Sequence, residues 1–325
     1  MIKNTSFRRK AKNKSIDVRK LRTIKGFPVN KNIKIAELLE NYKSIGFQAS
    51  HIGNAAEIIE SIKKEKAELF LACTSNMVSS GLREIIAQLV EKKIFAAIVT
   101  TTGAIEEDFI KSMNNFYLGS FDADDELVKK NAINRLGNIF VPDKNYADFE
   151  DWHMKFIERV VKEKNIIAPS EYIRRMGMEM NDKKSVLYHA ARKNVPIFCP
   201  GFVDGAIGDH FYFYNQSNKK KLIIDTVADV TKFYNMVLQP DKIAGIILGG
   251  GIAKHHLIGA AILRDGLDYA VYIQTGTEYD GSLSGAKPKE AVSWNKLKNE
   301  SNSVCIEADA TIVFPMLALS LIHQS

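Results

Sequence analysis

Short apolar segments typical of β-strands alternate with helix-patterned stretches from residue 65 to near the C-terminus. This alternation is typical of parallel strands joined by helices that cover both faces of one sheet. The apolar segments are short and rich in β-branched or aromatic residues, which favours strands over helices. We therefore expect an α/β fold with a doubly wound, mostly parallel, Rossmann-like sheet. The expected strands are Leu69–Cys73, Ile94–Thr100, Pro196–Cys199, Lys221–Asp225, Ile243–Leu248, Tyr269–Gln274 and Val304–Glu307.

The stretches between these strands predict the domain organisation. Residues 137–150 include Gly137 and Pro142 and are expected to form a loop. No Gly/Ser-rich linker divides the chain, so we expect one α/β domain over residues 31–325, preceded by a basic arm at residues 1–30. Helices are expected at 34–64, 79–92, 125–136, 151–165 and 170–193.

Positive charge is concentrated at the N-terminus. The 325-residue chain has a formal net charge of +7, but residues 1–25 contain ten Lys or Arg residues and a single acid, Asp17, so the remainder is close to neutral. Polyanion binding is therefore confined to this tail, and a solvated arm or one that docks on a neighbouring subunit is favoured over it. We expect no nucleic-acid partner.

Two further features bear on location. No stretch approaches the 18 or more uncharged apolar residues that a bilayer span requires, so no membrane partner is expected. Cys73, Cys199 and Cys305 lie far apart beside apolar residues, without metal-binding or redox spacing. This pattern favours reduced, buried thiols in a cytoplasmic protein.

Small and polar residues follow six of the expected strands. In a parallel sheet these ends line one crevice, where small residues let backbone N–H groups approach a pyrophosphate. Each turn alone is explained equally well by helix capping, but six together favour a dinucleotide site. No G-x-G-x-x-G or Walker A sequence occurs, so the standard glycine fingerprint is absent. The strand ends read TSN, TTTG, GFVDG, GGG, TGT and AD.

Acidic residues, an indole and a lysine crowd the segment from 249 to 309. Carboxylates and an aromatic face suit an organic cation such as a polyamine. Glu290 and Trp294, four residues apart, would share a helical face, and Lys296 would join them in one pocket only if the helix ended near Asn295. His255 and its neighbour His256 could equally be helix caps, and no third ligand has suitable spacing, so no metal is expected.

Several long motifs, in order, carry a resemblance that spans most of residues 65–318. GGGIAKHH, DGSLSGAKPKEAVSWNK and EADATIVFP resemble deoxyhypusine synthase, as do TSNMVSSGLRE, TTTGAIEEDFIK and PGFVDGAIGDHFYFY. The resemblance implies an NAD-dependent aminobutyl transferase that acts on spermidine, as a homotetramer with sites at subunit interfaces. The acceptor in that family is a lysine of the precursor of translation initiation factor five A.

The resemblance also assigns residues. Lys296 would be the nucleophile that attacks an imine of spermidine, with His255 as proton carrier. The expected NAD contacts are Ser75, Asn76, Ser79, Thr101, Gly103, Asp204, Thr275, Gly276 and Asp309. The expected polyamine contacts are Glu106, Glu107, Asp209, Gly250, His255, Gly281, Glu290 and Trp294.

Three positions depart from the pattern of the eukaryotic enzymes. Leu283 stands where those enzymes carry Asp, Gly259 where they carry Asn, and Asn295 where a Gly precedes the lysine. The first two would touch the polyamine pocket, so they bear on substrate identity more than on reaction type. The alternatives are a homospermidine synthase, with a small diamine as acceptor, and a non-catalytic NAD- or polyamine-binding protein.

Overall fold

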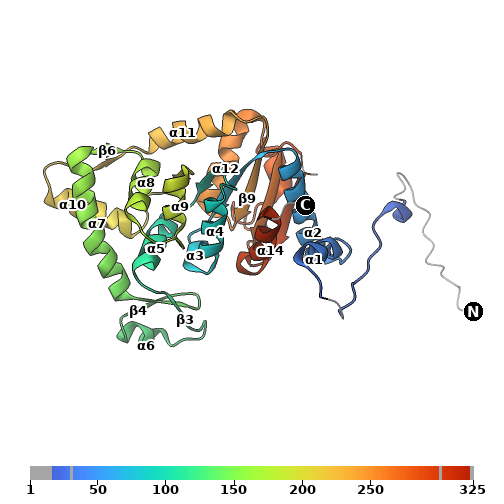
Figure 1. The fold of residues 1–325 in the computed structure, drawn as a ribbon, viewed down its shortest axis with the longest axis horizontal. Coiled ribbons are helices and arrows are strands. Elements are labelled where there is room, and N and C mark those ends of the chain that lie inside the picture. The colour runs from blue at the N-terminus through green and yellow to red at the C-terminus, as the bar shows by residue number, and fades with distance from the viewer. Residues whose placement is uncertain (1–16, 30–31, 300–301, 323–325) are drawn as a thin grey trace, which may run out of the picture.

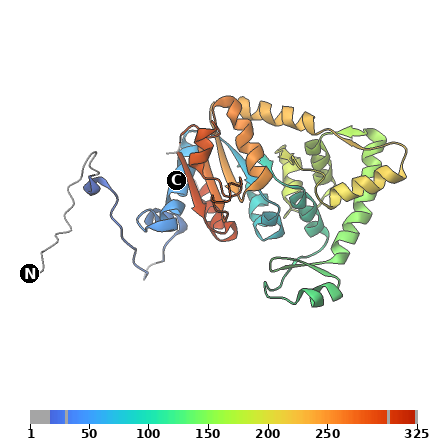
Figure 2. The same cartoon turned by 180° about the vertical axis from the view of Figure 1, so that it is seen from behind.

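The protein is described here by a computed structural model that covers residues 17–29, 32–299 and 302–322. Most of the basic arm, residues 1–16, lies outside the described residues. A parallel sheet forms the centre of the molecule, and helices lie on both of its faces (Figures 1 and 2). The predicted α/β class and the mostly parallel sheet are confirmed. Division into a basic arm and one catalytic domain stays a prediction.

In the described residues, the central sheet has six strands in the order β11-β10-β9-β1-β2-β7, and neighbouring strands are parallel. Its strands are β1 (Glu68–Cys73), β2 (Ala97–Val99), β7 (Ile197–Phe198), β9 (Ile243–Leu248), β10 (Tyr269–Gln274) and β11 (Ser303–Glu307). The smaller sheets contain β3 (Tyr117–Leu118), β4 (Ile133–Leu136) and β5 (Ile139–Pro142), and β6 (Ile166–Ile167) with β8 (Ile223–Ile224).

The helices follow the strands along the chain. They are α1 (Ile35–Tyr42), α2 (Phe47–Lys64), α3 (Asn76–Ser79), α4 (Leu82–Glu91), α5 (Thr102–Met113), α6 (Asp125–Lys130), α7 (Asp143–Glu163), α8 (Pro169–Glu179), α9 (Val186–Lys193), α10 (Ala206–Ser217), α11 (Thr226–Leu238), α12 (Gly251–Ala261), α13 (Pro288–Ser293) and α14 (Ala310–Ile322). Short 3₁₀ turns lie at η1 (Val18–Lys20) and η2 (Ile262–Arg264). No described helix is both long and apolar enough to cross a membrane.

The strand order places a topological switch between β1 and β9. The chain moves from β1 to β2 and β7 on one side, then returns to β9 and continues to β10 and β11 on the other. The two loops that leave the sheet here are in contact, because Thr74 N–H donates to Leu248 O at 3.2 Å. In open α/β sheets, ligands bind in the crevice outside the strand ends at such a switch.

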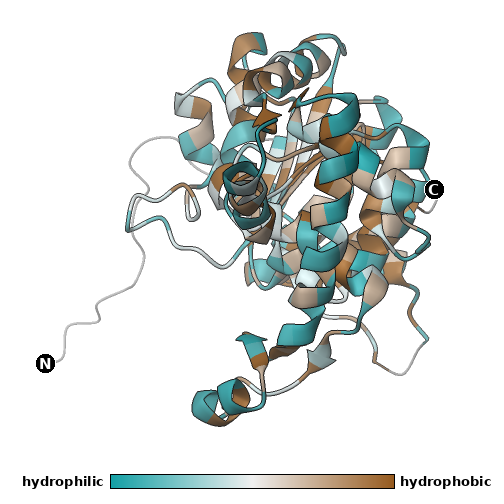
Figure 3. Ribbon diagram, turned by 90° about the vertical axis from the view of Figure 1, so that its left-hand side faces the viewer, coloured by the Kyte–Doolittle hydropathy of each residue, from teal (hydrophilic) through white to brown (hydrophobic). Residues whose placement is uncertain are grey.

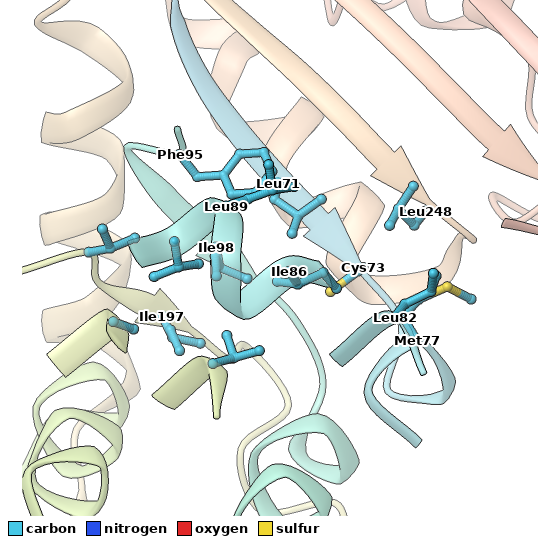
Figure 4. Packing of buried hydrophobic residues seen from close by; sticks show 14 of the residues in the cluster. Leu71, Cys73, Met77, Leu82, Ile86, Leu89, Phe95, Ile98, Ile197 and Leu248 are labelled. Carbon is cyan, nitrogen blue, oxygen red and sulfur yellow. The ribbon is translucent and has the colours of Figure 1, made fainter. Parts of the chain in front are cut away.

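Apolar side chains from both faces of the sheet form the core. One cluster packs β1 and β2 against α4 through residues such as Leu71, Ile98 and Ile86 (Figure 4). The other packs the opposite face against α11 and α12 through residues such as Phe70 and Phe233. Figure 3 shows the hydrophobic strands enclosed by helices with hydrophilic outer surfaces. All six residues of β9 are buried, because helices cover both faces of the sheet. A strand in this position is expected to be apolar along its whole length.

Several expected elements differ from the structure. The segment expected as a helix at 125–136 is helical only to Lys130, and its last four residues form strand β4. The loop expected at 137–150 contains β5 and the first two turns of α7. These residues form a small antiparallel sheet that, with α6, stands away from the body (Figure 1). An antiparallel hairpin needs only a short turn, supplied here by Gly137 at φ +59°.

Three other expected elements also differ from the structure. The expected strand at 221–225 pairs with β6 in a separate two-stranded sheet and does not join the central sheet. The helix expected at 34–64 is two helices, α1 and α2, with a break before Gly46. The helix expected at 170–193 is also two, α8 and α9, because residues 180–185 leave the helical conformation.

Candidate active site

A cleft of about 430 Å³ opens at the topological switch, where four strand ends meet. The loops after β1, β9, β10 and β11 line it. Of the residues predicted to contact NAD or polyamine, the cleft brings together Asn76, Gly250, Thr275, Gly276 and Asp309. Residues from widely separated parts of the chain therefore form one concave surface.

Close backbone approach at this cleft requires glycine. Gly249 has φ +83°, and a Cβ there would lie 2.8 Å from Thr74 Oγ1. A Cβ on Gly250 would lie 2.5 Å from Ser284 Cα, because the loop after β10 folds over the start of α12. No side chain of the described residues caps the N-terminus of α12. Its first backbone N–H groups therefore remain available to a ligand at the positive end of the helix.

Beside the cleft, the first turns of α5 hold two buried carboxyl groups. Glu106 Oε2 accepts a hydrogen bond from the N–H of Ile207 at 3.1 Å. Glu107 accepts one from the hydroxyl of Ser79, which places a predicted cofactor contact against a predicted polyamine contact. Ser75 also lies here, because a Cβ on Gly103 would approach its Cβ to 2.9 Å.

Burial changes the charge of this acidic pair. Loss of solvent raises the pKa of Glu106 to about 7, and the nearby charges of Asp209 and Asp204 act in the same direction. Burial likewise raises the pKa of Glu107 to about 7, against the hydrogen bond from Ser79. Carboxyl groups poised near neutrality among further acids are suited to bind a cation. Asp204 and Asp209 are themselves exposed.

Lys111 holds the end of helix α3 against helix α5, next to Glu107. Its ammonium donates to the carbonyl oxygens of Val78, Ser79 and Ser80, at 3.0, 3.1 and 3.0 Å. This links the end of α3 to α5, one turn beyond Glu107. These hydrogen bonds therefore hold the Ser79 hydroxyl close to the Glu107 carboxyl group, which accepts its hydrogen bond.

Helix α10, which carries Asp209, is anchored by a pair of histidines. His210 Nδ1 lies 2.9 Å from His153 Nδ1, and the Tyr172 hydroxyl lies 2.8 Å from His153 Nε2. Burial lowers the pKa of both imidazoles, more strongly for His153. An uncharged pair can share one hydrogen bond, since one ring donates and the other accepts. The anchor holds the helix that presents Asp209.

A second, narrow pocket contains Lys296. Glu290, Trp294 and Lys296 line it together, with Leu283 from the loop after β10. Helix α13 ends at Ser293, as predicted from the requirement that these side chains share one pocket. Asn295 then takes a left-handed conformation at φ +54°, and Lys296 N–H donates to Ala291 O at 2.9 Å. This turn places Lys296 beside Trp294, and Lys296 Nζ lies 5.4 Å from the centroid of the Trp294 ring.

Lys254 forms the inner wall of the Lys296 pocket. Its side chain is almost fully buried, and its ammonium donates to Gln274 Oε1 at 2.9 Å and to Ala286 O at 2.7 Å. It also lies 4.8 Å from the centre of the Tyr272 ring. Burial lowers the pKa of Lys254 to about 8. A buried lysine beside a second lysine is unusual and is compatible with a functional site.

Some predicted site residues lie outside these pockets. His255 is on the exposed side of α12 and does not line the Lys296 pocket. Its neighbour His256 stacks on Phe233, with ring centroids 4.9 Å apart. Both histidines lie inside the helix, so the alternative that they cap it is wrong. Gly281 forms an exposed turn, and Thr101 precedes α5 at the end of β2.

Sequence reasoning missed Lys254, Tyr272, Gln274 and Lys111. The signal for Lys254 was present, because a lysine inside the apolar stretch after GGG has few solvent-facing positions. Gln274 and Tyr272 were assigned only to a strand, and nothing in their spacing marks a site. No group of three or more His, Cys, Asp or Glu side chains that could hold a metal occurs within 17–29, 32–299 and 302–322.

Comparison with known proteins identifies the family. The sequence model of the deoxyhypusine synthase family matches residues 37–321. The probable deoxyhypusine synthase of Thermococcus gammatolerans is 45% identical over 306 residues, which cover 89% of this chain and 91% of that protein. The deoxyhypusine synthase of Kluyveromyces lactis is 38% identical over 334 residues, covering 89% and 88% of the two chains.

A solved structure agrees with these relatives. The crystal structure of a candidate deoxyhypusine synthase from Entamoeba histolytica superimposes with a TM-score of 0.65 and 28% identity, over 91% of this chain and 96% of that one. The residues matched by the family model, 37–321, include those of the cleft, the acidic pair and the Lys296 pocket. The chain therefore belongs to the deoxyhypusine synthase family of aminobutyl transferases.

Proposed function

We propose that this protein transfers the 4-aminobutyl group of spermidine to a lysine of the translation initiation factor five A precursor, with NAD as cofactor. The observation that carries the proposal is the pocket shared by Lys296, Glu290 and Trp294. In this pocket an amine nucleophile lies beside a carboxylate and an indole, the groups that bind an organic cation. Membership of the family supports the same reaction.

The cleft at the switch fits a dinucleotide. Its 430 Å³ volume lies within the range of cofactor sites, and glycines keep its rim open to a close backbone approach. The N-terminus of α12, which no described side chain caps, is suited to a pyrophosphate. Asn76, Thr275 and Asp309 would supply polar contacts along the cleft. Bound NAD would supply a hydride acceptor that later returns the hydride, so no cofactor is consumed overall.

The carboxyl groups would hold the polyamine. Glu106, Glu107 and Asp209 offer negative charge near the cleft, and Glu290 offers it in the Lys296 pocket. Charge-assisted hydrogen bonds from these groups would fix the ammonium ends, leaving the carbon between them at the cofactor. The expected cofactor contacts Ser75, Ser79, Thr101, Gly103 and Asp204 surround this acidic pair or lie at the neighbouring strand end.

Lys296 would accept the butylamine group as an imine and pass it to the acceptor amine. The amine of Lys296 attacks the imine carbon of the oxidised donor, and diaminopropane leaves with its electron pair and a proton. The acceptor lysine then displaces Lys296 in the same way. His255 would carry a proton in this exchange. Because it faces outward from α12, we infer that it acts towards a site shared with another subunit.

A homotetramer would complete the site. The acidic pair on α5 and the Lys296 pocket beside α13 belong to different parts of one chain, and among the described residues no hydrogen bond joins Glu106 or Glu107 to the lining of that pocket. Symmetric oligomers can bring such patches together across an isologous interface. We therefore propose that the acidic residues of one protomer and Lys296 of its partner serve one substrate.

A labelling experiment that identifies the acceptor of the butylamine group tests the proposal. The purified protein is incubated with NAD and spermidine labelled in the butyl chain, together with the factor precursor, putrescine, or neither. We expect label on the precursor lysine and no net NADH. Label on putrescine alone would identify a homospermidine synthase. Continuous NADH release in step with product would identify a dehydrogenase and contradict the transferase assignment.

A further inference from the structure

A further cavity lies at the edge of the central sheet, apart from the candidate active site. It has a volume of about 320 Å³ and opens between the edge strand β7 and the helices α8, α9 and α11. Residues 194–197, which lead into β7, line it, so the cavity lies at the amino end of that strand. The cleft at the topological switch lies at the carboxyl ends, and neither it nor the Lys296 pocket shares a lining residue with this cavity.

Most of the lining of this cavity is apolar. Helix α9 contributes Ala190 and Ala191, whose methyl groups fill little of the space beside Ile173 of α8 and Ile197 of β7. The volume lies at the lower end of the range for small-molecule sites, which are also mainly apolar with a few polar groups. The apolar part of a small ligand would therefore be removed from water here.

Two cations, Arg174 of α8 and Lys232 of α11, line the same cavity, and no carboxylate of the described residues does. Lys232 Nζ donates to Ser170 Oγ at 3.2 Å, the one hydrogen bond that its ammonium makes within the described part of the chain. An ammonium has three donors, so two are left for a ligand. Arg174 makes no ion pair or hydrogen bond with any described residue. Both side chains are exposed, which places their charges at the mouth of the cavity.

The nearby acid Asp229 does not neutralise these two cations. Its carboxyl group accepts hydrogen bonds from the Ser170 N–H at 2.7 Å and from the Ser170 hydroxyl at 2.6 Å. Ser170 therefore stands between Asp229 and Lys232, and Asp229 is not part of the lining. The mouth of the cavity keeps an excess of positive charge beside an apolar interior.

We propose that this cavity binds a small amphipathic carboxylate, with its apolar part between α8, α9 and β7 and its carboxylate at Arg174 and Lys232. Arginine binds a carboxylate through paired N–H groups, and lysine adds a point charge. The same two cations repel a polyamine, so the ligand of this cavity differs in charge from the donor of the proposed transfer reaction. The site is separate from that reaction, and the proposal does not depend on it.

Octanoate is the probe, because it joins one carboxylate to a short apolar chain. Its binding to the full-length protein is measured by calorimetry and compared with that of 1-octanol, which has the same chain without the charge. We expect octanoate to bind about tenfold more tightly than octanol, because the alcohol cannot form charge-assisted hydrogen bonds. Saturating spermidine should leave the affinity for octanoate unchanged, since the lining of this cavity is separate from the acidic pair and the Lys296 pocket.

The double variant Arg174→Gln/Lys232→Gln removes both charges and keeps most of the length of each side chain. It should bind octanoate about tenfold more weakly and octanol as the unchanged protein does. Lys155→Gln/Lys162→Gln is the matched control, because it removes two exposed charges of α7 that do not line the cavity. The control should bind octanoate normally. Circular dichroism verifies the fold of both double variants.

Three results would overturn the proposal. Octanoate that binds no more tightly than octanol, or does not bind at all, would show that the cavity does not recognise an anion. An affinity for octanoate that is the same in the Arg174→Gln/Lys232→Gln variant would place the ligand elsewhere. Displacement of octanoate by spermidine would place it at the polyamine site. The comparison of octanoate with octanol needs no variant, so it tests the proposal even if the double variant does not fold.

Discussion

Asn295 occupies the one position before Lys296 where the backbone must turn left-handed, at φ +54°. Glycine adopts this conformation without strain, and asparagine tolerates it better than other residues with a Cβ. The substitution of Asn for the Gly of the eukaryotic pattern therefore preserves the turn. Asparagine at this position is therefore compatible with the turn that precedes Lys296.

Position 295 should tolerate glycine but not a β-branched residue. Asn295→Gly should retain transfer activity and stability, whereas Asn295→Val should lower the free energy of unfolding by about 1–2 kcal/mol, the cost of a left-handed residue. It should also reduce transfer, because the turn that directs Lys296 is disturbed. Urea unfolding and transfer assays measure both effects. Equal behaviour of the two variants would show that the turn does not position Lys296.

Leu283 lines the Lys296 pocket and also packs against the neighbouring core cluster. The expectation that it contacts the polyamine and the alternative that it packs inward are therefore both compatible with its position. An aspartate here would add one charge-assisted hydrogen bond for a donor ammonium, worth about 1.5–3 kcal/mol in a desolvated site.

Leu283→Asp should accordingly raise the preference for spermidine over shorter amines, by up to about tenfold for each 1.4 kcal/mol gained. The measurement is kcat/KM for a series of donors of different length, with circular dichroism to verify the fold. Should the ranking of donors stay the same in the folded variant, Leu283 has no part in donor choice.

At the scale of elements, the two buried carboxyl groups of helix α5 are expected to make binding at the site depend on pH. The pKa of Glu106 and of Glu107 is raised to about 7 by burial, above the usual value of 4.5. The folded state thus binds protons that the unfolded state has released, so this contribution to stability is full below about pH 4.5 and is lost as the pH rises through 7. The same deprotonation creates the negative charge that a polyamine needs.

Spermidine should therefore stabilise the protein more at high pH. We expect the rise in Tm caused by spermidine to increase from pH 6 to pH 8, because both carboxyl groups lose protons across this range while the polyamine stays cationic. Glu107→Gln should flatten the dependence. A rise in Tm that is the same at both pH values, or larger at pH 6, would show that the acidic pair does not bind the donor.

The elements that sequence predicts well are those with a strong local pattern. Strand β9 is apolar at all six positions, and β10 is buried throughout, so their assignment needed no tertiary information. The strand β4 was missed because its residues, Ile133–Leu136, lie mostly at the surface and pair only with the neighbouring hairpin strand. Pairing with a partner strand, which a local pattern does not contain, decides such elements.

The site could be predicted only in part for a similar reason. The glycine and threonine turns at strand ends pointed to the cleft, because parallel strands bring their carboxyl ends together whatever their order. The hydrogen bond between Lys254 and Gln274 joins residues 20 positions apart across a helix and a strand. Its existence depends on how α12 packs on β10, which the sequence pattern does not specify.

At the scale of the whole molecule, two protomers are expected to share each site. Lys296→Ala and Glu107→Gln should each lose most activity as separate homo-oligomers. After the two are mixed and reassembled, half of the interfaces become mixed, and one site at each mixed interface recovers both intact groups. We expect about a quarter of the activity of the unchanged protein to return. No recovery, with mixed oligomers verified by native mass spectrometry, would place both groups in one protomer's site.

The central claim is that Lys296 carries the butylamine group, and trapping tests it most directly. The protein is incubated with NAD and labelled spermidine without acceptor, reduced with borohydride and digested for mass spectrometry. We predict that the label and the mass of one butylamine group are found on the peptide that contains Lys296, and that Lys296→Ala, although it still binds NAD, traps none. Label on another lysine, or undiminished transfer by Lys296→Ala, would contradict the account.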